Sequence, residues 1–328
     1  MFLSMVNSED NGLARLPPMG WMSWLKYYCY VDCIDYPNGC INQDLYMAQA
    51  DRLASDGWLA LGYSSIHIDD CWQQMNRSAD GKLVPDRTRF SNGIDALAKY
   101  MHDRNLTLGI YSDVGNKTCM GYPGSFGYED VDAQTFAGWG IDYLKYDGCA
   151  TNASASQQGL TKMHAALKNT GRSILLSLFE FEFEDLAFVK SISNLQRVYD
   201  DVQRYWASIL EIIDAIVARQ DWFSLYTGPG FWIDPDQNGT IMTFVKKMMP
   251  CFGDNCSYAI ALLNRDNTTA QAKSTSFVLS DLNLTNPHGY NIMDLWAGKV
   301  VGTYKPSDTY SAMVNATGVH FIKAITLQ

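Results

Sequence analysis

The sequence predicts an α/β fold in which helical crossovers join parallel strands, followed by an antiparallel β-sandwich. Three observations lead to this prediction. Short apolar runs alternate with amphipathic stretches between residues 65 and 226, which is typical of βαβ units. Acidic residues follow several of these runs, at the strand ends where a (β/α) barrel gathers its functional groups. From about residue 257, short strand-like segments alternate with Asn, Asp, Pro and Gly turns, which is typical of antiparallel sheets.

The elements of the first part follow one another in the order strand, helix, strand. Each expected strand is a short apolar run, and each expected helix is a longer amphipathic stretch. The expected strands are residues 65–68, 106–111, 141–146, 173–179, 195–199 and 222–226. The expected helices are residues 93–104, 133–139, 156–169 and 206–219.

The second part is expected to be an all-β module. Its expected strands are residues 258–263, 276–279, 290–295, 299–304 and 319–325. We therefore expect a barrel domain over residues 11–245 and a sandwich domain over residues 246–328, with the sandwich truncated at its start.

Length and composition exclude several classes of protein. A chain of 328 residues with 47% apolar and 18% charged residues can bury a large core in one or two domains. Its net charge of −10 argues against nucleic acid or an anionic membrane surface as a partner, because phosphate binding requires a basic patch. The same acidity is also compatible with a role in solubility alone. The sequence contains no apolar run of about 20 residues, so we expect no membrane span.

Cysteines and glycosylation triplets favour an oxidising compartment. The eight cysteines do not form the paired Cys-x-x-Cys pattern of a zinc site, so we expect disulfides and no metal. Nine Asn-x-Ser/Thr triplets point the same way. We expect a secreted or lysosomal protein whose signal peptide is missing from the start of this sequence. The alternative is a cytosolic protein with reduced thiols.

Two acidic strand ends are the candidates for catalysis. Lys145 and Asp147 lie two residues apart and so share one face of a strand. A cation there would keep Asp147 ionised, as a nucleophile requires. In the second cluster Asp201 follows Asp200, and a carboxyl group near other acids keeps its proton, which suits a general acid. The alternative for each acid is an ordinary ion pair or helix cap.

Two further groups are suited to binding a sugar. Asp69 and Asp70 follow the first expected strand and can accept hydrogen bonds from sugar hydroxyls, while Trp24 can form a stacking wall. The alternative for each is a packed or capping residue.

Several motifs in order resemble glycoside hydrolase family 27, the α-galactosidases and α-N-acetylgalactosaminidases. The resemblance is nearly continuous over residues 11–177 and less continuous to residue 236. After that, only the general pattern of short strands and turns is similar. The segments that carry it are Asn-Gly-Leu-Ala-Arg at 11–15, Met-Gly-Trp at 19–21, Ile-Asp-Asp-Cys-Trp at 68–72, residues 109–119, Pro-Gly-Ser-Phe-Gly at 123–127, Lys-Tyr-Asp-Gly-Cys at 145–149 and Gly-Pro-Gly at 228–230.

The resemblance implies a (β/α)8 TIM barrel, a C-terminal antiparallel β-sandwich and a catalytic pair. Asp147 would be the nucleophile and Asp201 the acid/base. No metal or other cofactor is implied, because two carboxyl groups suffice for this chemistry. The implied substrate-binding residues are Trp24, Asp69, Asp70, Tyr111, Lys145, Arg197 and Asp236.

The resemblance also implies disulfides and an assembly. The implied pairs are Cys29–Cys71, Cys33–Cys40 and Cys119–Cys149, and Cys251–Cys256 would be an additional local bridge. A homodimer is implied as well, although the altered C-terminal half can remove that interface.

Three departures from the family pattern affect these expectations. Residues 178–194 are shortened and lack a family disulfide and the loop that selects between galactose and N-acetylgalactosamine. Ile233 and Gln237 replace residues that are usually Asn and Met. About twenty residues separate Asp236 from the strand at 258, so we infer an internal deletion and a barrel that is incomplete at its last strand. Either residues 240–249 fill the breach, or the chain is a splice or gene-model product that folds poorly.

The sequence therefore predicts an O-glycoside hydrolase (EC 3.2.1.-). Its substrates would be glycolipids, glycoproteins and oligosaccharides with a terminal α-galactosyl group, cleaved with retention by double displacement. We expect an α-galactosidase first and an α-N-acetylgalactosaminidase next, although residues 197–203 favour the second branch slightly. The alternative is an inactive or unstable truncated isoform that at most binds sugar weakly.

Overall fold

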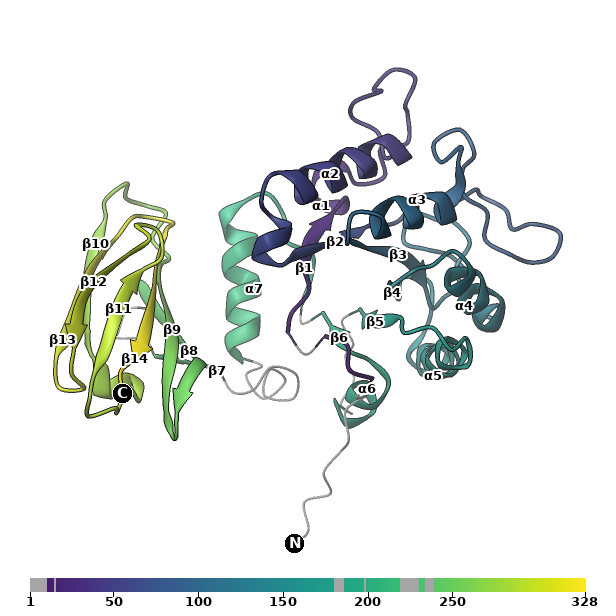
Figure 1. The fold of residues 1–328 in the computed structure, drawn as a ribbon. Coiled ribbons are helices and arrows are strands. Elements are labelled where there is room, and N and C mark those ends of the chain that lie inside the picture. The colour runs from purple at the N-terminus through teal and green to yellow at the C-terminus, as the bar shows by residue number, and fades with distance from the viewer. Residues whose placement is uncertain (1–10, 15, 180–185, 198, 219–229, 234–238) are drawn as a thin grey trace, which may run out of the picture. The chain divides into compact units, whose positions relative to one another are not determined.

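The computed structural model describes residues 11–14, 16–179, 186–197, 199–218, 230–233 and 239–328. The chain divides into two compact units, Met1–Asp201 and Val202–Gln328. Figure 1 shows an α/β first unit and a β-rich second unit. None of the helices in the described ranges is long and apolar enough to cross a lipid bilayer.

A six-stranded parallel sheet forms the centre of the first unit. Its strands stand in chain order, and every neighbouring pair is parallel. The sheet therefore has the topology of an incomplete TIM barrel, with edges at its first and last strands in the described part of the chain. The strands are β1 (Met19–Met22), β2 (Tyr63–His67), β3 (Thr107–Asp113), β4 (Tyr143–Asp147), β5 (Leu175–Leu178) and β6 (Leu195–Gln196).

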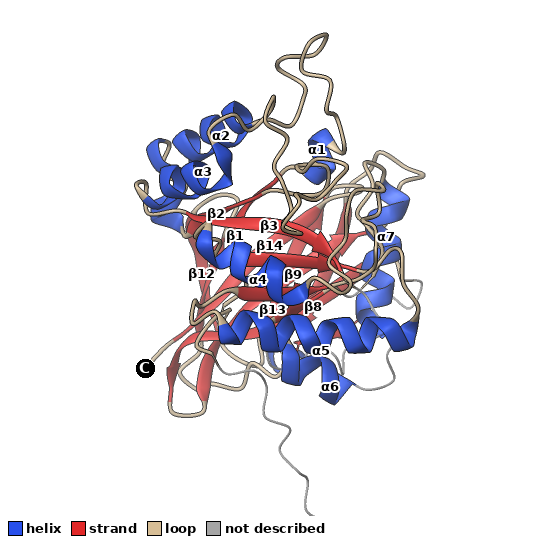
Figure 2. Cartoon of the chain, turned by 90° about the vertical axis from the view of Figure 1, so that its right-hand side faces the viewer, coloured by secondary structure: helices blue, strands red, loops and turns tan. Residues whose placement is uncertain are grey.

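Helices connect these strands and cover one side of the sheet (Figures 1 and 2). Asn42 and Asn152 start two of them, and each amide oxygen accepts a backbone N–H three residues further on. The helices are α1 (Trp24–Tyr27), α2 (Gln43–Ser55), the 3-10 turn η1 (Leu59–Leu61), α3 (Gly93–His102), α4 (Glu129–Gly138), α5 (Ala153–Asn169) and α6 (Leu186–Ile192).

One apolar core joins the helices of the first unit to the sheet. In α3, Ile94, Leu97, Ala98 and Met101 recur at helical spacing and are buried. They belong to the same cluster as Ile110 of β3. This core holds the strands rigidly, so that residues at their carboxyl ends are fixed relative to one another.

The second unit comprises the helix α7 (Trp206–Ala218) and an antiparallel sandwich. Its larger sheet has the strand order β12-β11-β14-β9-β8-β7, and β10 pairs with β13 in a two-stranded sheet. The elements are β7 (Gly230–Ile233), β8 (Ile241–Phe252), β9 (Asn255–Asn264), β10 (Lys273–Val278), η2 (Leu279–Leu282), β11 (Tyr290–Asp294), β12 (Lys299–Tyr304), β13 (Thr309–Val314) and β14 (Val319–Thr326).

The predicted fold class is confirmed, and five of the expected barrel strands correspond to β2–β6. The expected strand at 222–226 lies outside the described residues. Sequence reasoning did not identify β1, α1, α2, α6, β7 or β13. The first three lie before the alternation that it recognised, and α6 lies in the stretch that departs from the family pattern.

The expectation that residues 240–249 fill the breach in the barrel is wrong. They form the first part of β8, which pairs antiparallel with β9 and β7 in the sandwich sheet. Buried Ile241 and Val245 pack into the sandwich core, because alternate residues of a strand in this sheet face that core. The two compact units divide between residues 201 and 202. The sequence predicts the domain boundary further on, between residues 245 and 246.

All eight cysteines are joined in the predicted pairs. These are Cys29–Cys71, Cys33–Cys40, Cys119–Cys149 and Cys251–Cys256. The first closes a span of 42 residues and the second a span of 7 residues. The first three restrain loops at the carboxyl ends of β1–β4, and the fourth joins β8 to β9.

We predict that Ile110→Ala lowers the free energy of unfolding by about 3 kcal/mol, because it leaves a cavity in a closed core. Ile110 is 1% exposed. Ile34→Ala is the matched control, since Ile34 is 92% exposed, and should change stability by less than about 0.5 kcal/mol. Urea unfolding of the three proteins measures both effects. Equal losses would contradict the assigned core.

Candidate active site

The predicted site residues of the first unit follow the carboxyl ends of the parallel strands. Trp24 follows β1, Asp69 and Asp70 follow β2, Arg197 follows β6, and β4 ends at Asp147. Because all six strands run in the same direction, these ends meet at one edge of the sheet. Asp236 lies outside the described residues.

Asp147 is buried and its carboxylate is held at both oxygens. The hydroxyl of Tyr111 donates to its Oδ2 at 3.0 Å, and the backbone N–H of Gly148 donates to its Oδ1 at 3.0 Å. A Cβ atom at position 148 would overlap the ring of Phe179, so glycine lets the β5 end approach the β4 end. The Tyr111 hydroxyl and the Gly148 N–H together fix the orientation of the Asp147 carboxylate.

Lys145 forms an ion pair with Asp69. Its Nζ donates to Oδ2 of Asp69 at 2.8 Å, and it lies 5.2 Å from the ring centre of Tyr111. Sequence reasoning paired Lys145 with Asp147, which shares its strand face. In the structure its direct partner is the acid that follows β2, and Asp147 contributes a longer-range attraction.

Asp70 and the Cys119–Cys149 disulfide lie beside this group. The N–H of Met120 donates to Oδ2 of Asp70 at 3.0 Å. Sγ of Cys119 lies 3.2 Å from the hydroxyl oxygen of Tyr111 and 3.5 Å from Oδ2 of Asp147. The disulfide therefore borders Asp147.

Asp201 belongs to a second group, which includes Trp24 and Arg197. The indole Nε1 of Trp24 donates to Oδ2 of Asp201 at 3.2 Å, and Nη2 of Arg197 lies 2.9 Å from Oδ1. Sequence reasoning expected other acids beside this carboxyl group. The structure instead surrounds it with a cation and an indole N–H, and leaves its side chain 43% exposed.

Ser23 connects the two groups. Its Oγ accepts a hydrogen bond from the N–H of Asp69 at 3.3 Å and one from the hydroxyl of Tyr46 at 3.1 Å. The next residue in the chain is Trp24, whose indole reaches Asp201. Fully buried Ser23 thus ties the end of β2 to the residue that holds Asp201.

Asp113 is a site residue that sequence reasoning did not select. It ends β3, and its carboxylate accepts hydrogen bonds from the N–H groups of Gly115 at 2.7 Å and Cys149 at 2.9 Å. The sequence contained a signal for Asp113, because it follows a short apolar run as Asp147 does. In the structure Asp113 lies in register with Asp147 on the neighbouring strand.

Burial determines the electrostatics of this edge. Desolvation raises the pKa of both Asp70 and Asp113 from an ordinary 3.8 to about 6, although backbone N–H donors oppose the shift in each case. Desolvation also raises the pKa of Tyr111, and the surrounding carboxylates add to that effect. For Lys145, desolvation acts to lower the pKa, but the charges of Asp69 and Asp147 outweigh it and the pKa is raised. Tyr111 therefore stays protonated and Lys145 stays charged at neutral pH.

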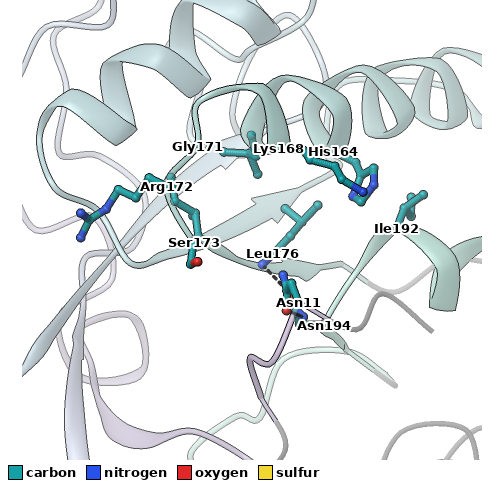
Figure 3. A pocket seen from close by; sticks show the side chains of 11 residues that line it. Asn11, His164, Lys168, Gly171, Arg172, Ser173, Leu176, Ile192 and Asn194 are labelled. Atoms are coloured by element: carbon teal, nitrogen blue, oxygen red, sulfur yellow. Dashed lines mark hydrogen bonds between the residues drawn. The ribbon is translucent and has the colours of Figure 1, made fainter. Parts of the chain in front are cut away.

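Two other features of the first unit resemble binding sites. Ligand atoms of Asp113, Cys119 and Cys149 lie within 4.8 Å of one another, but the two sulfurs share a disulfide and offer no thiolate to a metal. A pocket of about 200 Å³ lies where β5 begins, at the opposite edge of the sheet (Figure 3). Asn194 accepts from the N–H of Leu176 there and exchanges amide hydrogen bonds with Asn11, so this contact joins the segment before β1 to β5.

The arrangement provides a buried oriented carboxylate and a second, solvent-accessible carboxyl group at the same edge of one sheet. The first can attack an electrophilic carbon while the Tyr111 hydroxyl stabilises it. The second can exchange a proton with solvent and with a substrate oxygen.

Comparison with known proteins identifies relatives for both parts of the chain. A family model described as α-galactosidase A matches residues 16–245, and a model of the α-galactosidase C-terminal β-sandwich domain matches residues 253–324. The α-N-acetylgalactosaminidase of Gallus gallus is 47% identical over 235 residues, which are 69% of this chain and 58% of that protein. Human α-galactosidase A is 44% identical over 234 residues, which are 69% of this chain and 54% of that protein. The chain thus spans little more than half the length of these relatives.

Solved structures also resemble this chain. α-Galactosidase I from Mortierella vinacea has a TM-score of 0.75 and 26% identity, with 96% of this chain and 98% of that chain covered. A GH27 β-L-arabinopyranosidase from Geobacillus stearothermophilus has a TM-score of 0.76 over 95% of this chain and 97% of that chain. Its identity is 15%, so that likeness concerns the fold alone.

We predict that Lys145→Met destabilises the chain by about 3 kcal/mol, because it leaves Asp69 buried without its cation. The side chain of Asp69 is only 2% exposed. Lys99→Met is the matched control, since it breaks an exposed pair with Asp103 and should cost less than about 0.5 kcal/mol. Urea unfolding near pH 7 compares them. A loss no larger than that of the control would contradict the buried pair.

We predict that Asp113 makes the chain less stable as the pH rises from about 4 to about 6. Its folded-state pKa is about 6 against an ordinary 3.8, so in this range the folded chain binds more protons than the unfolded chain. Between pH 4 and 7, Asp113→Asn should gain about 2 kcal/mol of unfolding free energy relative to the unsubstituted protein. Urea unfolding at several pH values measures this difference, and parallel curves for the two proteins would contradict it.

Proposed function

Since this chain belongs to glycoside hydrolase family 27, the family of α-galactosidases and α-N-acetylgalactosaminidases, we propose that it is a retaining glycosidase. It hydrolyses terminal α-linked galactose, or N-acetylgalactosamine, from oligosaccharides, glycoproteins and glycolipids by double displacement. The observation that carries this proposal is the buried Asp147 carboxylate, which Tyr111 and Gly148 orient at the edge where Asp201 is also held.

Asp147 is the nucleophile in the first step. One of its oxygens forms a bond to the anomeric carbon while the bond from that carbon to the leaving oxygen breaks, and Asp201 gives its proton to that oxygen. In the second step Asp201 takes a proton from water, whose oxygen attacks the anomeric carbon and releases Asp147. The Tyr111 hydroxyl donates to Oδ2 of Asp147 and so orients the nucleophile.

The remaining residues of the edge bind the sugar. Asp69, paired with Lys145, and Asp70 offer acceptors to hydroxyl groups, and Trp24 offers an indole face beside Asp201. Arg197 lies 2.9 Å from Oδ1 of Asp201 and orients that carboxyl group. Of the two sugars, we propose galactose as the preferred one.

We also propose that the chain follows a secretory route to a lysosomal or extracellular site. Its four disulfides are typical of proteins that fold in an oxidising compartment. The nine glycosylation triplets agree with that route. The homodimer implied by the family resemblance stays a prediction.

We predict that the purified chain releases 4-nitrophenol from the α-galactoside or from its 2-acetamido analogue at mildly acidic pH. Asp147→Asn and Asp201→Asn should each lower kcat by about a thousandfold or more, because each removes a group that acts on the reacting atoms. Asp200→Asn is the matched control, because Asp200 is the exposed neighbour of Asp201. It should stay within about threefold of the unsubstituted protein.

The stereochemistry of the first product tests the mechanism separately. Proton NMR early in the reaction should show the α-anomer of the released sugar, because two displacements restore the original configuration. Initial release of the β-anomer would contradict double displacement. A folded chain that turns over neither substrate would favour the alternative, an inactive protein that at most binds sugar weakly.

A further inference from the structure

Two acids stand side by side at the carboxyl edge of the sheet, and only one of them is the proposed nucleophile. Asp113 ends β3, Asp147 ends β4, and the two residues are paired in register. Asp147 is 8% exposed, whereas Asp113 is 0% exposed. A substrate therefore does not reach the carboxylate of Asp113, and any role of this residue in the reaction is exerted through its neighbours.

Successive peptide groups after β4 bind the two acids. The N–H of Gly148 donates to Oδ1 of Asp147 at 3.0 Å, and the next N–H, that of Cys149, donates to Oδ2 of Asp113 at 2.9 Å. Successive backbone N–H groups are an anion-binding arrangement. A single Cα atom joins these two peptide groups, and it belongs to a glycine, whose backbone rotates freely unless both sides are held. The bond to Asp113 therefore fixes the direction of the N–H that orients Asp147.

The other oxygen of Asp113 holds the loop after β3. Its Oδ1 accepts a hydrogen bond from the N–H of Gly115 at 2.7 Å. Between these two residues, the N–H of Val114 donates to the backbone oxygen of Asp147 at 2.8 Å. A Cβ atom at position 115 would overlap the backbone oxygen of Ala150, so glycine lets the loop after β3 approach the loop after β4. Asp113 thus joins both loops at the position of the nucleophile.

Asp113 is costly to the stability of the fold. Desolvation raises its pKa from an ordinary 3.8 to about 6, and the charges of Asp147 and Asp70 act in the same direction. Sγ of Cys119 lies 3.9 Å from its Oδ2, but a neutral disulfide does not offset the charge. A buried acid beside two other acids lowers the stability near neutral pH, so stability does not explain why this position holds a carboxylate.

We propose that Asp113 is a positioning residue for the nucleophile: by anchoring the N–H of Cys149, it holds the N–H of Gly148 against Asp147. This inference rests on the proposed function. Asp113 neither touches the substrate nor exchanges a proton with it. It keeps the Asp147 carboxylate from rotating away from the anomeric carbon, and a nucleophile held in its attacking geometry reacts faster than one that must first be oriented. Loss of Asp113 therefore lowers kcat and leaves the affinity for the sugar unchanged.

Kinetics and sugar binding of three variants test the proposal. Asp113→Ala removes both acceptor oxygens and should lower kcat for 4-nitrophenyl α-galactoside by about a hundredfold, as expected for a misplacement of about 1 Å. Asp113→Asn keeps one acceptor oxygen and should lower kcat by about tenfold. The Kd of galactose, from calorimetric titration, should stay within about twofold in both. Asp142→Asn is the matched control, because Asp142 accepts the N–H of Leu108 at the opposite edge of the sheet. Its kcat should stay within about twofold.

Urea unfolding of the same variants excludes a folding defect, because activity and stability should change in opposite directions. From pH 4 to 7, Asp113→Asn should gain stability relative to the unsubstituted protein, although its kcat is lower. Asp142→Asn should lose stability, because it breaks the ion pair with Arg172, although its kcat is retained. An unchanged kcat in Asp113→Ala, or a galactose affinity that falls as much as kcat does, would overturn the proposal.

Hydrogen exchange gives a readout that needs no turnover. The amide protons of Gly148 and Cys149, followed by mass spectrometry on a peptide that contains both, should exchange about tenfold faster in Asp113→Ala and unchanged in Asp142→Asn. If the unsubstituted protein hydrolyses no α-galactoside but these amides respond to Asp113→Ala, the glycosidase proposal fails and the anchoring by Asp113 stands. If it hydrolyses the substrate and neither the amides nor kcat respond, the positioning role fails and the glycosidase proposal stands.

Discussion

The buried ion pair between Lys145 and Asp69 is the interaction on which the proposed site depends. It joins β4 to the residues after β2, across the intervening strand β3. Tyr111 on β3 lies below the ammonium group and donates to Asp147. Three neighbouring strand ends are thus held by one charge-paired network, in which a cation offsets part of the repulsion among four buried acids. Without that cation, Asp69 would be a buried charge without a partner, which is the costliest arrangement in this region.

The disulfides extend this restraint from the strand ends to the loops beyond them. Cys119–Cys149 borders Asp147, and Cys29–Cys71 links the loop between α1 and α2 to the residue after Asp70. In the described part of the chain the parallel sheet has six strands, fewer than a closed TIM barrel uses. Covalent links between the loops add rigidity at its carboxyl edge. The division of the chain at 201/202 agrees with this view, because β7 and β8 pair within the sandwich sheet.

Most of the site could be predicted because strand-end acids are local features of the sequence. Asp147 and Asp69 each end a short apolar run, and the phase of those runs places them at one edge. The partner of Lys145 could not be predicted in this way, because spacing along one strand suggests Asp147 whereas the neighbouring strand supplies Asp69. The surroundings of Asp201 were also misjudged. Nothing local indicates that an indole 177 residues away donates to it.

The sequence by itself determined the α/β order of the first part, the β-sandwich of the last part and the acids at the strand ends. These follow from periodicity, residue type and motifs that are contiguous in the chain. Only the tertiary structure decided that residues 240–249 belong to the sandwich and that Lys145 pairs with Asp69. It also decided that the ring of Tyr28 packs against the rings of Trp24 and Tyr30. Each of these depends on which segments meet in space, and pairing between distant segments is set by burial and by competition among partners.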